Sequence, residues 1–132
     1  MAEVMVVREI DVLIIDEHAD VRTLLARRLS ADPRFRVIAH TGSPLRGTEL
    51  AWAWEPDIIL IEPKSAARTG ADAYLRIARA SPRSRLVVFT SYLREGERRA
   101  YLEAGVAKCL LKGMSMKALA RELVSLTQPA LV

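Results

Sequence analysis

Features that define several common protein classes are scarce in this sequence. Its 132 residues include a single cysteine, Cys109, so no intramolecular disulfide can form. Neither that thiol nor the two histidines, His18 and His40, have the spacing of metal ligands. Aromatic residues make up 5% of the chain, and no apolar run reaches the length of about 18 residues that a membrane span needs. These absences exclude a disulfide scaffold, a structural zinc site and a membrane protein.

The composition that remains is typical of one globular domain. Hydrophobic residues make up 51% and charged residues 27%, outside the range of disordered chains. A chain of 132 residues can bury a sizeable core without metals or disulfides. The net charge of +4 favours acidic partners only weakly, because the basic residues are scattered along the chain.

The amino terminus lacks the signals of exported proteins. Residues 1–15 are largely apolar, but charged residues interrupt them and no small-residue cleavage site follows. We therefore expect a cytoplasmic protein. We assign residues 1–9 to a leader, 10–127 to the domain, and 128–132 to a tail or the start of a linker to a domain absent from this sequence.

Five short apolar runs have the composition of buried strands. Each is a near-continuous hydrophobic stretch, and most are rich in Val and Ile, as in strands that are covered on both faces. Strands of this kind are typical of parallel sheets. The runs are Val12–Ile15, Val37–Ala39, Ile58–Ile61, Leu86–Phe89 and Cys109–Leu111.

Helical patterns separate these runs. The first has apolar residues at helical spacing, Val21, Leu25 and Leu29, and ends before Asp32-Pro33. The alternation of strands and helices predicts an α/β fold: a single doubly wound, five-stranded parallel sheet of flavodoxin-like order 2-1-3-4-5, with helices on both faces. The other helices are expected at Leu45–Trp54, Ala71–Ala80, Arg94–Ala104 and Met116–Leu126.

Polar side chains follow the predicted strands at their carboxyl ends, where doubly wound sheets bind ligands. Carboxylates such as these could supply oxygen ligands to Mg²⁺, which needs few protein ligands. Without a metal, the lysine among them would pair with one or two of the acids, and the residues alone leave both alternatives open. The residues are Asp16 and Glu17 after the first strand, Glu62 after the third, Thr90 after the fourth and Lys112 after the fifth.

In order and spacing, the chain resembles a response-regulator receiver domain of two-component signalling from Asp11 to about Leu126. In that family an acid pair holds Mg²⁺, and an aspartate at the end of the third strand accepts a phosphoryl group from a histidine kinase. A Ser or Thr then hydrogen-bonds the phosphoryl group and a lysine neutralises it. The resemblance implies that Asp16 and Glu17 are the acid pair, Thr90 the hydroxyl and Lys112 the lysine. It rests on residues 13–18, 56–62, 87–91, 104–105 and 110–112.

Glu62 stands where the family has its phosphoacceptor aspartate. Its extra methylene moves the carboxylate by about a bond length toward Lys112, and in-line attack tolerates little misplacement. We therefore predict an atypical receiver that forms no aspartyl phosphate efficiently. Asp57 cannot substitute, because it lies roughly 16 Å away at the opposite end of the same strand. Cys109 stands where the family usually has a switching aromatic residue, so the usual path from site to output surface is altered.

The resemblance implies a signalling protein that is not an enzyme. We expect a phosphorylation-independent module that binds a protein partner, or forms a homodimer, through the family's usual output face. That face consists of the segments Arg94–Ala104, Cys109–Leu111 and Met116–Leu126. The alternative is a Mg²⁺-dependent receiver that is still phosphorylated at Glu62 or another residue, although Glu62 argues against control by a histidine kinase.

Contact with DNA is expected only through an absent output domain. The basic pairs of the chain, such as Arg27-Arg28, have no interleaved aromatic residues on which bases could stack. By analogy with the family, the chain would then be the receiver half of a transcription regulator.

Two further expectations concern single side chains. Glu62 offers one charge and two oxygens, whereas a phosphate monoester carries a charge of about −1.5 to −2 and three acceptor oxygens, so Glu62 can mimic phosphorylation only in part. Trp52 and Trp54 lie two positions apart in a predicted helix and cannot share a face. We expect one of them to pack on the sheet.

Overall fold

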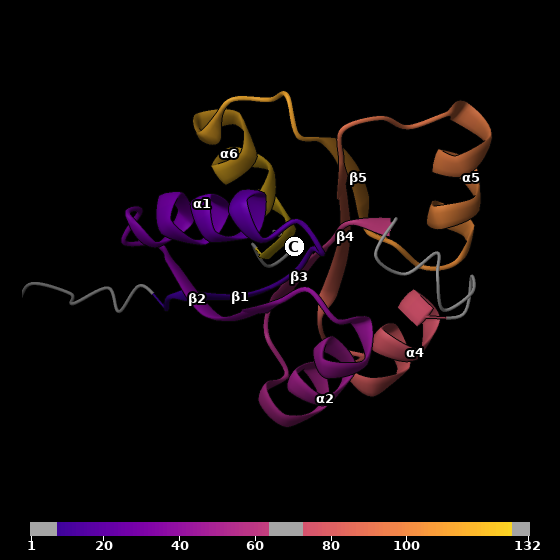
Figure 1. Ribbon diagram of the computed structural model, residues 1–132, viewed down its shortest axis with the longest axis horizontal. Helices are drawn as coiled ribbons and strands as arrows, with labels where there is room; N and C mark the ends of the chain where they lie inside the picture. Colours follow the sequence, from indigo (N-terminus) through magenta and orange to yellow (C-terminus); the bar gives the residue numbers. More distant parts are fainter. Residues whose placement is uncertain (1–7, 64–72, 128–132) are drawn as a thin grey trace, which may run out of the picture.

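The computed structural model describes residues 8–63 and 73–127, in which strands and helices alternate (Figure 1). The helix predicted over Ala71–Ala80 is described from Ala73, and its first two positions lie outside the described residues. No helix in these two ranges has both the length and the hydropathy that a bilayer span requires. The strands are β1 (Ile10–Ile15), β2 (Phe35–Thr41), β3 (Ile58–Ile61), β4 (Arg85–Thr90) and β5 (Lys108–Leu111). The helices are α1 (Ala19–Ser30), α2 (Pro44–Trp54), α4 (Ala73–Ala80), α5 (Glu95–Glu103) and α6 (Met116–Thr127).

The strands form one parallel sheet in the order β2-β1-β3-β4-β5, which confirms the predicted fold. Helices α1 and α6 cover one face of the sheet, and α2, α4 and α5 lie on the other (Figure 1). Successive side chains of a strand point to opposite faces, so each central strand contributes side chains to a hydrophobic core on each face of the sheet. This explains why the strands are apolar runs without alternation.

The core beneath α1 and α6 is built from alternate positions of the central strands. Leu25 and Leu29 of α1 and Leu119 and Leu123 of α6 pack onto it, and each is at most 7% exposed. The strand residues in this core are Val12, Ile14, Ile58, Leu60, Val87 and Phe89.

Helix α2 lies very close to the opposite face of the sheet. A Cβ atom added to Gly47 would lie 2.4 Å from Cδ1 of Ile15, and Gly47 and Ala51 are the buried residues of the helix. This approach leaves no room for an indole ring between α2 and β1. Trp52 and Trp54 are accordingly 73% and 59% exposed, so the prediction that one of them packs on the sheet is wrong.

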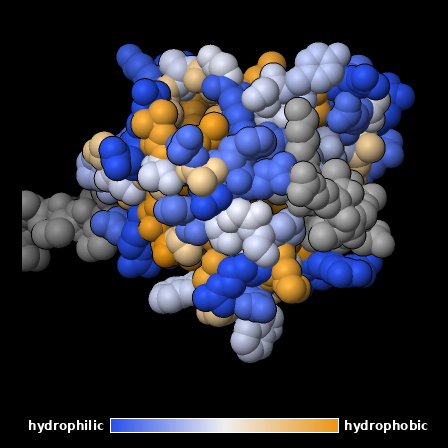
Figure 2. Space-filling view, viewed as in Figure 1, coloured by the Kyte–Doolittle hydropathy of each residue, from blue (hydrophilic) through white to orange (hydrophobic). Residues whose placement is uncertain are grey.

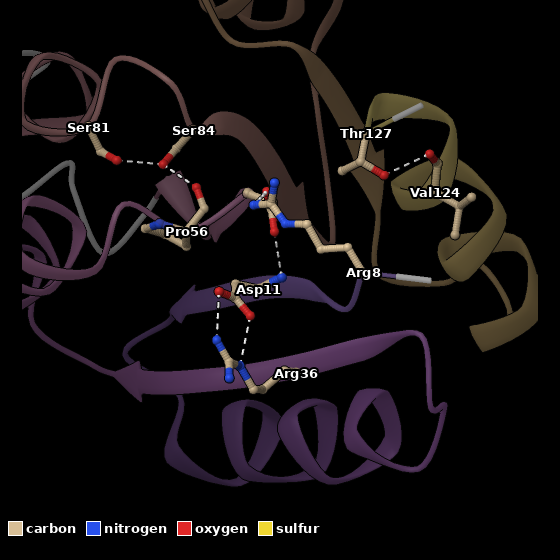
Figure 3. A network of polar contacts seen from close by, with 9 residues as sticks. Arg8, Asp11, Arg36, Pro56, Ser81, Ser84, Val124 and Thr127 are labelled. Atoms are coloured by element: carbon tan, nitrogen blue, oxygen red, sulfur yellow. Dashed lines mark hydrogen bonds and ion pairs between the residues drawn. The ribbon is translucent and has the colours of Figure 1, made fainter. Parts of the chain in front are cut away.

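Asp57 lies at the amino edge of the sheet, as predicted from its position in the strand. Its carboxylate accepts hydrogen bonds from Arg8 Nη2 (2.7 Å) and from the backbone N–H of Asp11 (2.8 Å). The Asp11 carboxylate in turn accepts hydrogen bonds from Nε and Nη2 of Arg36, at 2.8 and 2.9 Å (Figure 3). Asp57 is therefore part of a network that ties β1, β2 and the start of β3 together.

Candidate functional site

Four of the five predicted site residues converge at the carboxyl edge of the sheet. Asp16 follows β1, Glu62 follows β3, Thr90 ends β4 and Lys112 follows β5. The first three are only 1% to 3% exposed, and the Lys112 side chain is 14% exposed. Hydrogen bonds of the sheet continue past the strand ends: Glu62 N donates to Ile15 O (2.9 Å) and Lys112 N to Thr90 O (2.8 Å). The sheet therefore fixes the backbone from which these side chains project.

Both oxygens of the Glu62 carboxylate are in contact with donors. Thr90 Oγ1 donates to Oε1 at 3.0 Å, and Lys112 Nζ lies 2.9 Å from Oε2. The backbone carbonyl of Tyr92 offers the Thr90 hydroxyl a longer alternative at 3.3 Å. Glu62 thus meets the hydroxyl and the ammonium that the resemblance assigns to the phosphoryl group.

The Lys112 ammonium bridges two carboxylates. Besides Glu62, it contacts Asp16, where Nζ donates to Oδ2 at 2.6 Å. Burial on its own would lower the pKa of Lys112, but hydrogen bonds from the ammonium to Asp16 and Glu62, with their charges, raise that pKa above 10.5. Lys112 is therefore a fully charged cation held between two acids.

His18 contacts the other carboxylate oxygen of Asp16. The backbone N–H of His18 donates to Asp16 Oδ1 at 2.9 Å, and its ring Nδ1 lies 3.0 Å from the same oxygen. Burial favours the neutral form of Asp16, yet the hydrogen bonds from Lys112 and His18 outweigh it and hold the Asp16 pKa below 3.8. Arg22 Nη1 adds a hydrogen bond of 2.6 Å to the Asp16 backbone oxygen.

Glu17 lies outside this buried cluster. Its side chain is exposed, whereas Asp16 beside it is 2% exposed. Arg22 was not among the predicted site residues. The available signal was that Arg22 lies four residues after His18, one helical turn along α1.

The buried carboxylate oxygens of Asp16 and Glu62 are arranged around the Lys112 ammonium. Among residues 8–63 and 73–127, no three or more His, Cys, Asp and Glu side chains are grouped so that they could hold a metal ion. The Asp16 and Glu62 carboxylates each contact Lys112, and their remaining oxygens face His18 and Thr90. In this arrangement the residues do not fit Mg²⁺ unless Lys112 withdraws. Metal binding by Asp16, Glu17 and Glu62 stays a prediction.

Cys109 lies away from the site, inside the core beneath α2, α4 and α5. It is 6% exposed, and burial raises the pKa of its thiol. A buried protonated thiol packs as a small apolar side chain.

Comparison with known proteins agrees with the resemblance. Residues 12–124 match the profile of the response regulator receiver domain family. The transcriptional regulatory protein LiaR of Bacillus subtilis is 34% identical over 103 residues, which are 78% of this chain and 49% of LiaR. The nitrate/nitrite response regulator protein NarL of Escherichia coli is 29% identical over 112 residues, which are 85% of this chain and 52% of NarL. The chain thus spans about half the length of these curated relatives.

Solved structures share the fold at low sequence identity. The isolated REC domain of RcsB from Salmonella enterica serovar Typhimurium has a TM-score of 0.78 and 16% identity, covering 90% of this chain and 88% of that chain. The response regulator domain of Thermotoga maritima CheB has a TM-score of 0.77 and 21% identity, covering 93% of this chain and all of that chain. These likenesses show the shared fold, and the profile match over residues 12–124 shows that the chain belongs to the response regulator receiver domain family.

Proposed function

We propose that this receiver domain signals without being phosphorylated, because Glu62 permanently holds the groups that a phosphoryl group holds in relatives. The observation that carries the proposal is the pair of contacts at its carboxylate: Thr90 at one oxygen and Lys112 at the other. Glu62 is also 3% exposed, so a phosphodonor has little access to it. The domain is a signalling component and not an enzyme.

The chemistry of phosphoryl transfer supports the same proposal. A nucleophilic carboxylate needs an oxygen aligned with the incoming phosphorus, and small displacements from that alignment lower the rate strongly. Here both Glu62 oxygens already face donors. Receiver domains generally bind Mg²⁺ at the phosphorylation site, whereas in this chain Lys112 lies between the two buried acids.

We propose that the output is contact with a protein partner, or with a second copy, through the face formed by α5, β5 and α6. Helix α5 has no buried residue. Leu102 of α5 and Leu111 of β5 are 45% and 46% exposed. The charged pair Lys108–Glu122 links β5 to α6. Exposed apolar side chains together with charged residues are typical of a protein interface.

The names of the relatives extend the proposal to transcription. LiaR is a transcriptional regulatory protein, and this chain matches only about half of its length. We propose that the domain regulates transcription through a DNA-binding output domain outside this sequence, so that DNA contacts belong to that domain.

A second candidate is a Mg²⁺-dependent receiver that is phosphorylated at Glu62 or at another residue. The observation in its favour is that Asp16, Thr90 and Lys112 are all at the site. These are the residue types that the resemblance assigns to phosphoryl transfer.

Intact-mass spectrometry after incubation with acetyl phosphate and Mg²⁺ tests the proposal. We expect no phosphoryl adduct on the wild-type domain, and we expect one on Glu62→Asp, which shortens the side chain to that of the family's acceptor. Asp57→Asn in the Glu62→Asp background is the matched control, because Asp57 lies at the other edge of the sheet. A phosphoryl adduct on the wild-type domain would overturn the proposal in favour of the second candidate.

A further inference from the structure

The outward face of α2 carries two large apolar side chains that the fold does not use. Leu45 is 72% and Trp52 is 73% exposed. They lie seven residues apart, which is close to two helical turns, so they share one face and are separated by about 10 Å along the axis. Because Gly47 and Ala51 supply the contact with the sheet, nothing in the packing of the domain requires Leu45 or Trp52 to be apolar.

An ion pair, which carries no net charge, lies between these two apolar residues along the helix. Arg46 Nη1 donates to Glu49 Oε2 at 2.9 Å. Around this pair is an open hollow of about 520 Å³, and Figure 2 shows hydrophilic and hydrophobic surface alternating over α2 at the lower edge of the molecule. The hollow is lined by Arg46, Thr48, Glu49, Trp52 and Ala53 of α2 and by Ala80 of α4.

We propose that this face binds the same face of a second copy of the chain, with the two α2 helices antiparallel about a twofold axis. A twofold rotation reverses the direction of the helix, so it brings Leu45 of each copy opposite Trp52 of the other. The same rotation places the Arg46–Glu49 pairs side by side near the axis, where each arginine meets a glutamate of either copy. The face is therefore complementary to itself in both apolar character and charge.

Its size fits a weak association. Two tryptophans and two leucines would form the apolar centre, and a buried aromatic side chain covers roughly 150–250 Å². Stable complexes usually bury about 1,200–2,000 Å² in total. We therefore expect association at high protein concentration, or wherever two copies are held close together. This face lies on a different helix from the α5, β5 and α6 face, so both surfaces can be occupied at once.

Sedimentation of the folded domain over a range of concentrations tests the inference. We expect a reversible monomer–dimer equilibrium for the wild type and a dissociation constant at least about tenfold weaker for Trp52→Ala, because buried tryptophans are typical interface hot spots. Trp54→Ala is the matched control, since Trp54 is a 59% exposed tryptophan of the same helix outside the Leu45–Trp52 stripe. Its dissociation constant should equal that of the wild type. Circular dichroism verifies that both variants are folded.

Charge reversal tests the twofold arrangement itself. Glu49→Arg alone places like charges beside each other within and between the copies, and it should weaken the dimer. The double variant R46E/E49R exchanges the two signs and should restore association, because the reversed pairs are again complementary. A separate readout uses Trp54→Phe, which leaves Trp52 as the sole tryptophan. Its emission should shift to shorter wavelength as concentration rises.

Three results would overturn the inference: a monomer at every concentration, equal effects of Trp52→Ala and Trp54→Ala, or a double charge reversal that fails to restore the dimer. Leu102→Ala separates this inference from the proposed function. If Leu102→Ala abolishes the dimer and Trp52→Ala does not, association uses the α5, β5 and α6 face. That outcome overturns the α2 inference and supports the proposed function.

Discussion

Two networks of ion pairs lie at opposite edges of one sheet, and they differ in burial. At the carboxyl edge, Lys112 lies 2.6 Å from Asp16 and 2.9 Å from Glu62, with side chains that are 14%, 3% and 3% exposed. At the amino edge, Arg36 lies 2.8 Å from Asp11, and the arginine side chain is 59% exposed. The distances are similar, so geometry does not distinguish the two networks. Exposure to water does.

This difference predicts unequal energies. An exposed ion pair contributes about 0–1 kcal/mol, because water screens the charges and because ordering two long side chains costs entropy. Removing one member of a buried pair costs about 3–5 kcal/mol, because an uncompensated charge remains in the protein. The site residues should therefore control the stability of the domain, while the amino-edge pairs should matter little.

The largest effect is expected for Lys112→Met. The substitution keeps much of the side-chain volume but leaves Asp16 and Glu62 facing each other without a cation. We expect the free energy of unfolding to fall by about 3–5 kcal/mol, measured by urea denaturation followed by circular dichroism. Lys117→Met is the control, because Lys117 is an exposed lysine of α6. A loss no greater than that of the control would mean that the two edges are energetically alike.

The dependence of stability on pH gives a second test of the buried network. The folded pKa of Lys112 is raised above 10.5, so its contribution is complete below pH 10.5 and is lost as the pH rises through the raised value. The folded pKa of Asp16 is lowered, so its contribution is complete above pH 3.8 and is lost as the pH falls through the lowered value. Thermal unfolding should show that the stability difference between wild type and Lys112→Met is constant at neutral pH and shrinks at both extremes. A difference that grows above pH 10.5 would contradict this linkage.

A smaller loss is expected for Thr90→Val. Valine has nearly the same shape, so the change removes the hydroxyl and leaves Glu62 Oε1 buried without that donor. The free energy of unfolding should fall by about 1–3 kcal/mol, measured by urea denaturation. Thr127→Val removes a hydroxyl that donates to Val124 O (3.0 Å) near the end of α6, at a partly exposed position (Figure 3). Equal losses for the two variants would show that burial of the hydrogen bond is unimportant here.

The same contrast explains how far the sequence could predict the molecule. Apolar runs such as Ile58–Ile61 are determined by burial on both faces, so they identify the strands and the fold without any knowledge of neighbours. Position after a strand placed Glu62, Thr90 and Lys112 at one edge for the same reason. These features depend on chain order and topology alone.

What the sequence left open depends on distances between elements. Whether Lys112 would pair with one acid or two could not be predicted, because the answer depends on where the loop after β5 lies relative to β1 and β3. The exposure of Trp52 and Trp54 was missed because it follows from the close approach of Gly47 to Ile15. The distance between a helix and a sheet cannot be calculated from residue types alone. In this sequence, the small residues at the buried positions of α2 were the only sign of the close approach.

The smallest effect is expected for Arg36→Ala at the amino edge. Arg36 Nε and Nη2 both donate hydrogen bonds to the Asp11 carboxylate in a favourable bidentate geometry. The arginine side chain, however, is largely exposed to water. We therefore expect only a small loss of stability in urea denaturation at low ionic strength, well below the loss caused by Lys112→Met. Added salt should reduce that loss further, since screening lengths fall to about 8 Å near physiological ionic strength. The loss caused by Lys112→Met should change much less with salt, because its partners are buried. If salt reduced both losses by the same fraction, burial would not be what separates the two edges of this sheet.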